Sequence, residues 1–338
     1  MVKWVDGFAC EDDVVVSTRI RLARNLKDYR FPQKMNMEES EKLTQDILNV
    51  MKDITGNMNY KFIRINNLTP IERVVYIEEH LISPGLIQRP DYSSFLLRDD
   101  ENITIMINEE DHLRIQALLP GLNFGKAWQI ISEVDDFLES FLDYAFHQEF
   151  GYLTACPTNT GTGLRASVMV HLPSLTATGH INNFINSLNK IGLAVRGIYG
   201  EGTETVGNLF QISNQMTLGQ GEEEIIRILE NIVNQILERE RNARRNLIEN
   251  RKYEVEDRVF RSLGILKHSR MISSKEAMGL LSNVRLGIEM GIIDDIELKK
   301  IDKLMITIQP AYIQNYASKE LTENERNIVR ASYIRERL

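Results

Sequence analysis

The spacing of apolar residues in the first half of the chain predicts both helices and strands. Apolar positions recur every three or four residues over 37–54 and 127–147, which predicts two amphipathic helices. Between them, Thr69-Pro70-Ile71-Glu72 joins a capping box to a proline at the first helical position, so we expect a helix from there to about His80. Stretches of extended character predict strands at 60–65, 94–98 and 103–108. The last two are separated by a polar turn and are expected to form an antiparallel hairpin.

The pattern changes after Gly151, where short extended segments alternate with glycine loops. Strands are predicted at 151–157, 165–173, 193–200 and 209–216, with one helix at 181–191. After Gly219 the periodicity is helical throughout, and Ser/Thr-x-x-Glu helix starts occur at Ser273 and Thr322.

This order of elements predicts the α+β class. Hairpin signals without regular βαβ alternation favour a mostly antiparallel sheet flanked by helices, followed by an all-α domain. The change in pattern between residues 220 and 250 predicts domains at 1–240 and 241–338. A length of 338 residues is also what two domains of ordinary size need.

Composition narrows the class of protein. The chain is 43% hydrophobic and 26% charged, as in globular proteins, and its net charge of −8 disfavours direct binding to nucleic acid. Its two cysteines, Cys10 and Cys156, cannot build a disulfide framework or a zinc site alone. Neither a signal peptide nor an apolar run long enough for a membrane span is visible. We therefore expect a cytoplasmic protein.

Arginines are the first candidate functional residues, because the chain has none of the common phosphate-binding glycine motifs. They stand beside predicted strands and glycine turns, at Arg19, Arg21, Arg114, Arg165 and Arg196. Arginine forks hold phosphate oxygens in pairs and stay charged at any working pH. Each arginine taken alone is more typical of a surface or ion-pair residue, and although five of them beside loops of one domain carry more weight, spacing does not prove that they converge.

Carboxylates and one cysteine are the second group of candidates. Glu109, Glu110 and Asp111 follow the apolar strand at 103–108, and Glu201 stands between two glycines in a tight loop. Solvated turn acids are the alternative interpretation of all four. Cys156 precedes a proline and several hydroxyl residues, which can favour its thiolate, although a lone cysteine is more often a small buried apolar residue.

Four segments together resemble the motif set of the phosphagen (guanidino) kinases. They are STRIRLARN from Ser17, INEEDHLRI from Ile107, CPTNTGTGLRASV from Cys156, and RGIYGEGTE from Arg196 followed by ISN. Their order and separations are similar to those of the family, and they span Ser17 to about Gly219. Members of this family move the γ-phosphoryl group of MgATP onto a guanidinium nitrogen.

The resemblance implies a role for each matching residue. The five arginines would clamp the nucleotide phosphates, and His80 would lie against the nucleoside. The implied ATP-binding residues are Ser17, Thr18, Arg19, Ile20, Arg21, His80, Arg114, Arg165, Ala166, Ser167, Val168, Met169, Arg196, Gly197, Ile198, Tyr199 and Gly200. Mg²⁺ would be held mainly by phosphates and water, without a protein metal site. Glu110 and Glu201 would grip the guanidinium and accept its proton, and Cys156 would support it as a thiolate.

The layout of the chain is closest to one branch of the family, the bacterial protein arginine kinases. Enzymes of the family that act on small guanidino compounds carry a helical domain before the first arginine motif, whereas here that motif begins at Ser17 and a long helical segment follows Gly219. The segments NFGKA, DRVFRSLGIL and ERNIVRASYIRERL add to this similarity. The resemblance implies a protein-arginine kinase. A free-arginine phosphagen kinase and a catalytically silent phosphoarginine-binding adaptor remain the alternatives.

The branch also implies partners and regulation. Its substrates include a heat-shock repressor and proteins marked for a Clp ATPase/protease, its activator is a zinc-binding protein, and it forms homodimers through the helical domain. It further implies an allosteric phosphoarginine pocket with the pattern Arg-Asp-x-x-Arg-Ala, matched here by Arg326, Asn327, Arg330 and Ala331. Asn327 replaces the Asp and lacks its charge. Solvated arginines on an amphipathic final helix are the alternative.

A basic stretch on the first long C-terminal helix completes the candidates. It contains Arg239, Arg241, Arg244, Arg245, Arg251 and Lys252. Because Glu238, Glu240 and Glu249 are interspersed with them, we expect a solvated helix face rather than a docking site for an acidic partner.

Overall fold

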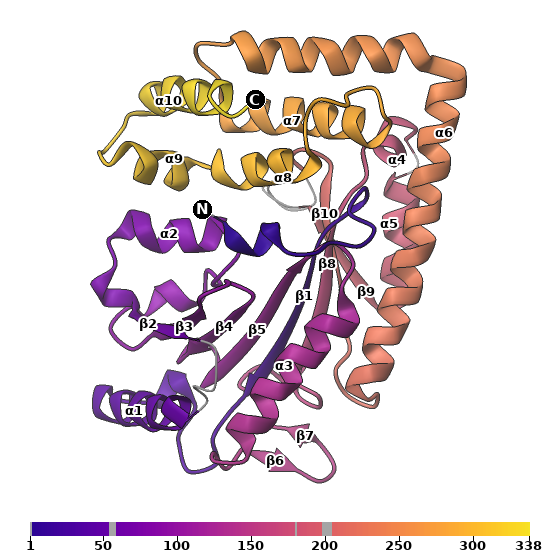
Figure 1. Cartoon of the computed structure of the whole chain (residues 1–338). Helices are drawn as coiled ribbons and strands as arrows, with labels where there is room; N and C mark the ends of the chain where they lie inside the picture. The colour runs from indigo at the N-terminus through magenta and orange to yellow at the C-terminus, as the bar shows by residue number, and fades with distance from the viewer. Residues whose placement is uncertain (1, 54–58, 180, 198–204) are drawn as a thin grey trace.

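A single antiparallel sheet forms the centre of the molecule (Figure 1). The computed structural model describes residues 2–53, 59–179, 181–197 and 205–338. Within them, eight strands pair in the order β2-β3-β4-β5-β1-β8-β10-β9, and every pairing is antiparallel. The strands are β1 (Val15–Arg24), β2 (Tyr60–Arg64), β3 (Ser94–Arg98), β4 (Ile103–Ile107), β5 (Leu113–Pro120), β8 (Leu164–His171), β9 (Leu193–Gly197) and β10 (Leu209–Asn214). A separate two-stranded hairpin joins β6 (Phe146–His147) to β7 (Gly151–Tyr152).

Helices cover the sheet and then form a layer of their own. They are α1 (Met37–Asp53), α2 (Pro70–Glu78), α3 (Phe124–Glu139), α4 (Pro173–Ala177), α5 (Ile181–Lys190), α6 (Glu222–His268), α7 (Ser274–Glu289), α8 (Leu298–Thr307), α9 (Pro310–Ala317) and α10 (Glu323–Arg335). In Figure 1, α6 follows one side of the sheet and then bends across the top, above α7. The predicted α+β class, with a mostly antiparallel sheet and a helical C-terminal region, is confirmed.

Strand alternation gives the sheet two different faces. On β1, Ile20 and Leu22 are fully buried in the main apolar core, to which α3 and the first half of α6 contribute. Arg19 and Arg21 alternate with these two residues along the strand and therefore point to the opposite face. The helices of the main core pack on the apolar face, and the arginines stand on the other face.

Several local signals produced the expected helix starts. The side-chain oxygens of Thr69 and Thr322 each accept the backbone N–H three residues later, and the carboxylates of Glu72 and Glu325 accept the backbone N–H groups of Thr69 and Thr322, so both capping boxes are present. At Ser273 the hydroxyl caps α7 in the same way.

The helix predicted over 127–147 is wrong at its C-terminal end. α3 begins earlier, at Phe124, and ends at Glu139. Beyond it Leu142 and Tyr144 are buried while Asp143 is exposed, which is the period of an extended chain and not of a helix. Main-chain bonds from Ala145 to Asn25 and from Leu153 to Ala145 hold this segment beside the end of β1.

Two other predictions also need correction. The strand expected over 151–157 is limited to Gly151–Tyr152, and Pro157–Asn159 form a single 3₁₀ turn. No strand was predicted over Leu113–Pro120, yet these residues form β5, one of the two strands that flank β1. The proposed boundary at residue 240 remains a prediction: α6 runs through it and departs from helical backbone at Arg251.

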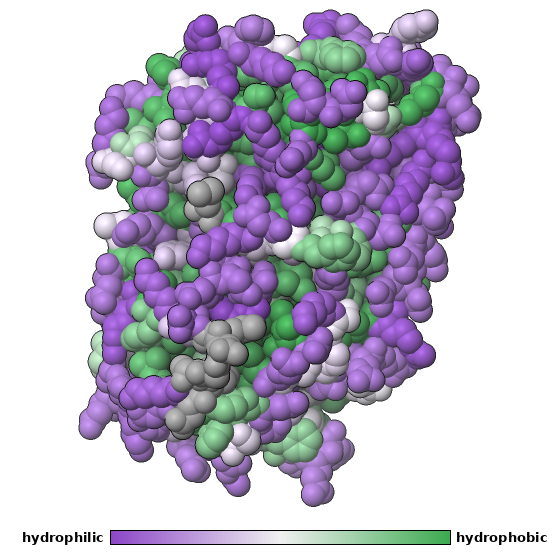
Figure 2. Space-filling view, viewed as in Figure 1, coloured by the Kyte–Doolittle hydropathy of each residue, from purple (hydrophilic) through white to green (hydrophobic). Residues whose placement is uncertain are grey.

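The helical layer has its own core and also packs on the sheet. Buried residues of α6, α7 and α8, such as Val259, Leu281 and Leu304, form one cluster with Val16 and Leu209, which belong to β1 and β10. The visible face of the molecule is mainly hydrophilic, with apolar side chains gathered near the top over the last part of α6 and α7 (Figure 2).

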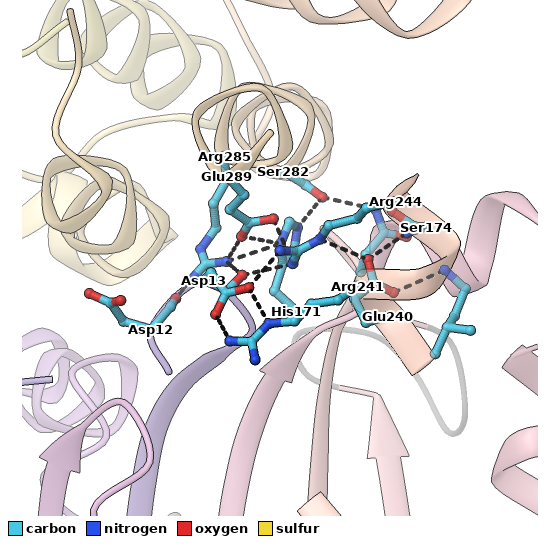
Figure 3. A network of polar contacts seen from close by, with 12 residues as sticks. Asp12, Asp13, His171, Ser174, Glu240, Arg241, Arg244, Ser282, Arg285 and Glu289 are labelled. Carbon is cyan, nitrogen blue, oxygen red and sulfur yellow. Dashed lines mark hydrogen bonds and ion pairs between the residues drawn. The ribbon is translucent and has the colours of Figure 1, made fainter. Parts of the chain in front are cut away.

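A buried network of charged residues joins the helical layer to the sheet (Figure 3). Glu289 of α7, whose side chain is completely buried, pairs with Arg285 and lies 2.8 Å from the Arg244 guanidinium. Arg244 also contacts Asp13 at 2.9 Å, and Arg285 contacts Asp302 at 2.7 Å. The network thus ties α6, α7 and α8 to the residues that lead into β1.

The solvated helix face expected around residues 239–252 is wrong for three of its members. Arg244 and Glu240 are buried, and Glu240 accepts the backbone N–H groups of Ser174 and Leu175 at the start of α4. Arg241 pairs with Asp13 at 2.5 Å and with Glu11. Sequence alone did not reveal this, because the partners of these residues lie far away along the chain.

His171, the last residue of β8, belongs to the same network. Burial, together with Arg285 and Arg244, holds the pKa of His171 well below its ordinary value, so the ring is neutral. Its Nδ1 atom lies 3.1 Å from the Glu289 carboxylate and 3.2 Å from the Arg285 guanidinium, and its Nε2 atom lies 2.8 Å from the hydroxyl of Ser282. Ser282 in turn accepts the side-chain amide of Asn208, just before β10. The end of β8 and the start of β10 are therefore held by α7.

Removing Glu289 tests the importance of this network. Glu289→Ala removes the completely buried carboxylate that Arg285 and Arg244 share, and we expect a loss of about 3–5 kcal/mol in the free energy of unfolding. The matched control is Asp257→Ala, which breaks the exposed α6 pair with Arg261 and should cost less than about 0.5 kcal/mol. Urea denaturation of the two variants measures the difference, and equal effects would contradict this account.

Candidate active site

Strand register brings the five candidate arginines onto one face of the sheet. Residues that are directly opposite in neighbouring strands share a face. Arg21 on β1 lies opposite Arg165 on β8 and Gln116 on β5, and Arg114 is two residues from Gln116. The alternation continues outward through Ser167 and Met169 on β8, Ser213 and Gln211 on β10, and Arg196 on β9. All five arginines therefore stand on the face opposite the apolar core.

A cavity of about 490 Å³ lies over this face. Arg19, Arg21 and Arg196 line its floor, together with Gln116 and Ser167. Its other wall is the segment that follows α2, including His80, Ile82, Ser83 and Pro84. The cavity is thus a largely apolar hollow with arginines on its floor, formed between the sheet and the end of α2.

The arginines repel one another. Burial, and then Arg114 and Arg165, lower the pKa of Arg19 to about 10. The pKa of Arg21 is well below its usual range for the same reasons, with Arg19 as the largest neighbouring charge. The Nε atoms of Arg19, Arg21 and Arg165 are buried without a hydrogen-bond partner among the described residues. Unpaired buried donors carrying positive charge are the features that a bound polyanion satisfies.

Glu109 is the carboxylate that offsets part of this charge. Its side chain is buried, lies 2.5 Å from the Arg114 guanidinium and accepts the hydroxyl of Ser83. Arg114, the largest favourable influence, keeps the pKa of Glu109 below its ordinary value despite burial. The solvated alternative is therefore wrong for Glu109. In the sequence, Glu109 is not distinguishable from the neighbouring acids Glu110 and Asp111, and its pairing with Arg114 is visible only in the structure.

His80 has an unusual backbone and a neutral ring. Its φ of 63° is in the left-handed region, and its carbonyl oxygen accepts the side-chain amide of Gln116 at 3.0 Å. Burial and Arg19 lower the pKa of the His80 imidazole to about 3. The ring therefore stays neutral at physiological pH and faces the cavity beside the arginines.

A second turn holds Glu110 close to the arginines. Asn108, with φ of 57°, begins the tight turn from β4 to β5, and this turn carries Glu109, Glu110 and Asp111. Burial raises the pKa of Glu110, and the neighbouring Asp111 raises it further, while Arg114 opposes the shift. Glu110 is thus a partly buried carboxylate with increased affinity for a proton.

Asp111 connects this turn to the loop that carries Cys156. Its Oδ1 atom accepts the side chain of Asn25 at 2.6 Å and the backbone N–H of Ala155 at 2.7 Å. Cys156 is only half-buried, and its Sγ lies 3.0 Å from the Thr158 hydroxyl, so it is not the buried apolar residue of the alternative interpretation. Arg165 is electrostatically coupled to both Cys156 and Arg114. Glu110 and Cys156 therefore meet at the same end of the arginine row.

The other predicted nucleotide-binding residues divide into three groups. Ser17, Ser167, Val168, Met169 and Gly197 line the cavity. Thr18, Ile20 and Ala166 are buried on the opposite face, where the Thr18 hydroxyl donates to the carbonyl of Gly121 at 2.7 Å. Ile198, Tyr199, Gly200 and the candidate base Glu201 lie outside the described residues.

The candidate allosteric residues lie on α10. Arg330 is buried, and its guanidinium donates to the carbonyls of Ile308 and Ile272 at 2.7 and 3.0 Å and to the Asn327 side chain at 2.6 Å. Arg326 donates to the carbonyl of Leu321 at 2.8 Å, and Ala331 is fully buried. The alternative of solvated arginines is wrong for Arg330. The phosphoarginine pocket itself stays a prediction.

The described residues include no group of three or more His, Cys, Asp or Glu side chains placed to hold a metal ion. In the same part of the chain, no helix is long and apolar enough to span a membrane.

Comparison with known proteins agrees with this geometry. The sequence profile of the ATP:guanido phosphotransferase C-terminal catalytic domain matches residues 41–243. The chain belongs to this family. A second profile, the protein-arginine kinase McsB C-terminal domain, matches residues 252–338.

Individual guanidino kinases support the assignment. The chain is 51% identical over 335 residues to a Halothermothrix orenii protein named protein-arginine kinase, covering 99% of this chain and 96% of that protein. Two solved structures share the fold. The duplicated taurocyamine kinase from Schistosoma mansoni has a TM-score of 0.60 at 27% identity, over 70% of this chain and 35% of its own. Lombricine kinase has a TM-score of 0.61 at 25% identity, over 69% and 68%.

Replacing one central arginine should weaken ATP binding without lowering the stability of the fold. Arg21→Ala removes two or more charged hydrogen bonds to a bound polyphosphate, so we expect ATP to bind at least about tenfold more weakly by calorimetry. The same change relieves repulsion with Arg19, Arg114 and Arg165, and the melting temperature without ligand should stay the same or rise. Arg30→Ala is the control, because Arg30 pairs with Glu39 at an exposed site. Unchanged ATP affinity in Arg21→Ala would contradict this assignment.

Proposed function

We propose that this protein is a protein-arginine kinase, which transfers the γ-phosphoryl group of ATP to the guanidinium of arginine side chains in proteins. The observation that carries the proposal is the row of five arginines on one sheet face, ending at Glu110 and Cys156. The curated relative that is half identical over nearly the whole chain carries that name.

The geometry suits phosphoryl transfer, which needs alignment and charge neutralisation more than covalent help from the protein. The nucleotide would place its phosphates along Arg19, Arg21 and Arg196, which line the cavity, and along Arg114 and Arg165, which share their sheet face, with His80 and Ile82 at the nucleoside end of the cavity. Mg²⁺, held mainly by phosphate oxygens and water, would neutralise part of the phosphate charge.

At the other end of the row, the acceptor guanidinium must lose a proton before it can act as a nucleophile, because its pKa exceeds about 12. Glu110 is suited to accept that proton, since its own pKa is raised. The Cys156 thiolate would stabilise the guanidinium cation electrostatically. We propose Glu201 as the second carboxylate, with Glu110, that holds the guanidinium. Asp111 acts on the reaction only by positioning the loop of Cys156 next to Glu110.

The wider biological role is a further part of the proposal and rests on the resemblance of the sequence. We propose substrates that include a heat-shock repressor and proteins marked for a Clp ATPase/protease, activation by a zinc-binding protein, a homodimer, and feedback through Arg326, Asn327, Arg330 and Ala331.

The decisive experiment offers labelled MgATP with an arginine-containing protein and, in parallel, with free arginine. We expect acid-labile label on the protein and little on the free amino acid, as a P–N bond to side-chain arginine requires. Label mainly on free arginine would support a phosphagen kinase instead. Bound ATP with no transfer to either acceptor, even with an activator present, would support the silent adaptor.

Two variants distinguish the roles of Glu110 and Cys156. Glu110→Gln removes the proton acceptor, so we expect transfer to fall by at least about 10²-fold while ATP affinity stays close to that of the wild type. For Cys156→Ser we expect a reduced but measurable rate. Single-turnover transfer and ATP calorimetry on the same preparations measure both. Wild-type turnover in Glu110→Gln would remove Glu110 from the mechanism, and an unchanged rate in Cys156→Ser would make the cysteine structural.

The pH dependence of the reaction follows from the shift at Glu110. The carboxylate must be ionised to accept a proton, and its pKa is raised above the ordinary 4.5, so activity should fall on the acid side at a pH higher than that value. His112, whose pKa is lowered to about 4, and His80 are neutral across this range and do not contribute to the fall. A profile of kcat/KM against pH measures it. An acid limb at or below 4.5 would contradict the proposed base.

A further inference from the structure

An exposed apolar groove lies beside the Cys156 loop, between the β6–β7 hairpin and the start of α6, at the lower end of the molecule in Figure 1. Phe146, Phe150 and Leu218 line it and are 56%, 46% and 51% exposed. The Phe146 ring meets Tyr152 edge to face at 5.2 Å, and Phe150 stacks on His147 at 4.9 Å. The rings are thus positioned by neighbours while their outer faces remain open to solvent. Grouped exposed side chains of this size mark a binding surface.

The rim of the groove is acidic. Glu149, Glu222 and Glu224 line it, and no Lys, Arg or His is among its lining residues. Within the described part of the chain none of these three carboxylates forms an ion pair. The groove therefore presents aromatic faces together with carboxylates that form no ion pair with a described residue.

The groove shares a wall with the candidate active site. Thr217 lines the groove, and its hydroxyl lies 2.7 and 3.0 Å from the carbonyl oxygens of Thr160 and Thr158. Thr158 in turn contacts the Cys156 thiol. The turn from Cys156 to Thr160 therefore has the candidate guanidinium site at one end and the groove against its other side.

We propose that this groove binds the basic residues that flank the target arginine in a polypeptide substrate. The inference rests on the proposed function and names the class of substrate that the site prefers. Lysine and arginine side chains match both features of the surface, because their aliphatic stems pack on aromatic rings and their charges interact with ring faces and carboxylates. An acidic flanking sequence is repelled. The internal contact of Arg24 with the inner side of the same hairpin, 3.6 Å from the Tyr152 ring centre, shows that its aromatic residues accept a guanidinium.

Two peptides that differ only in their flanks test this proposal. Each carries one arginine, surrounded in one peptide by lysines and in the other by glutamates. We expect kcat/KM to be about tenfold higher for the lysine-flanked peptide, and the preference to shrink as salt is added. Equal kcat/KM for the two peptides would overturn the proposal.

Charge variants locate the preference in the groove. In Glu149→Gln/Glu224→Gln we expect the ratio between the two peptides to fall close to one. The control, Glu249→Gln/Glu254→Gln, removes the same charge from exposed positions of α6 outside the groove and should keep the wild-type ratio. Loss of the ratio in both double variants would assign it to net charge and overturn the proposal.

Aromatic variants and a binding assay complete the test. Phe146→Ala/Phe150→Ala should weaken binding of the fluorescent lysine-flanked peptide, measured by anisotropy, whereas Phe260→Ala, at a 52% exposed position of α6, should not. Anisotropy measures peptide binding without phosphoryl transfer, so it tests the groove independently of the reaction. If no peptide arginine is phosphorylated, that result refutes the proposed function but leaves the test of the groove intact. Sedimentation of the same variants measures their oligomeric state and therefore tests whether a second copy of the chain occupies the groove instead. A change in oligomeric state with unchanged peptide binding would overturn the proposal.

Discussion

Electrostatic repulsion among arginines on one sheet face is the constraint on which the rest of this structure depends. Burial and neighbouring arginines, Arg114 among them, lower the pKa values of Arg19, Arg21 and Arg165, and Glu109 offsets only part of this charge. Such an arrangement persists only on a rigid support. The central strand β1 provides it, because β5 and β8 pair with it on both sides and its other face is fully buried. A charge of this kind is one that a bound polyanion offsets.

The helical layer adds to the rigidity of that support. Asp13 leads into β1 and His171 ends β8, and both are held by the network of Arg244, Arg285 and Glu289. The same two strands carry Arg19, Arg21 and Arg165 further along. Movement of α7 relative to the sheet would therefore shift the strands on which these arginines stand. In this molecule the packing of the C-terminal region and the geometry of the cavity are mechanically linked.

The loop of Cys156 is held from both sides. Asp111 binds its N-terminal end through Ala155, next to Glu110, and Thr217 contacts the carbonyls at its C-terminal end. The loop is thus a partition between the chemical site and the acidic aromatic groove. Its two sides differ in physical properties: the side toward the arginine row is charged and enclosed, and the side toward the groove is aromatic and open.

Local sequence determined the elements and the chemical groups of this protein. The capping boxes at Thr69 and Thr322, the hairpin strands and the four motifs required only short-range information, and the motif set alone indicated guanidino kinase chemistry. Tertiary structure decided what distant residues do together. Register across β5, β1, β8, β10 and β9 aligned the arginines, and long-range pairing converted Arg244 and Glu240 from an expected solvated surface into a buried network. The segment after α3 extended instead of continuing as helix because its main chain bonds to residues near Asn25. The physical reason is the same in each case: spacing along a chain reports the face that a side chain occupies, whereas charge balance and strand pairing depend on partners that only folding brings close.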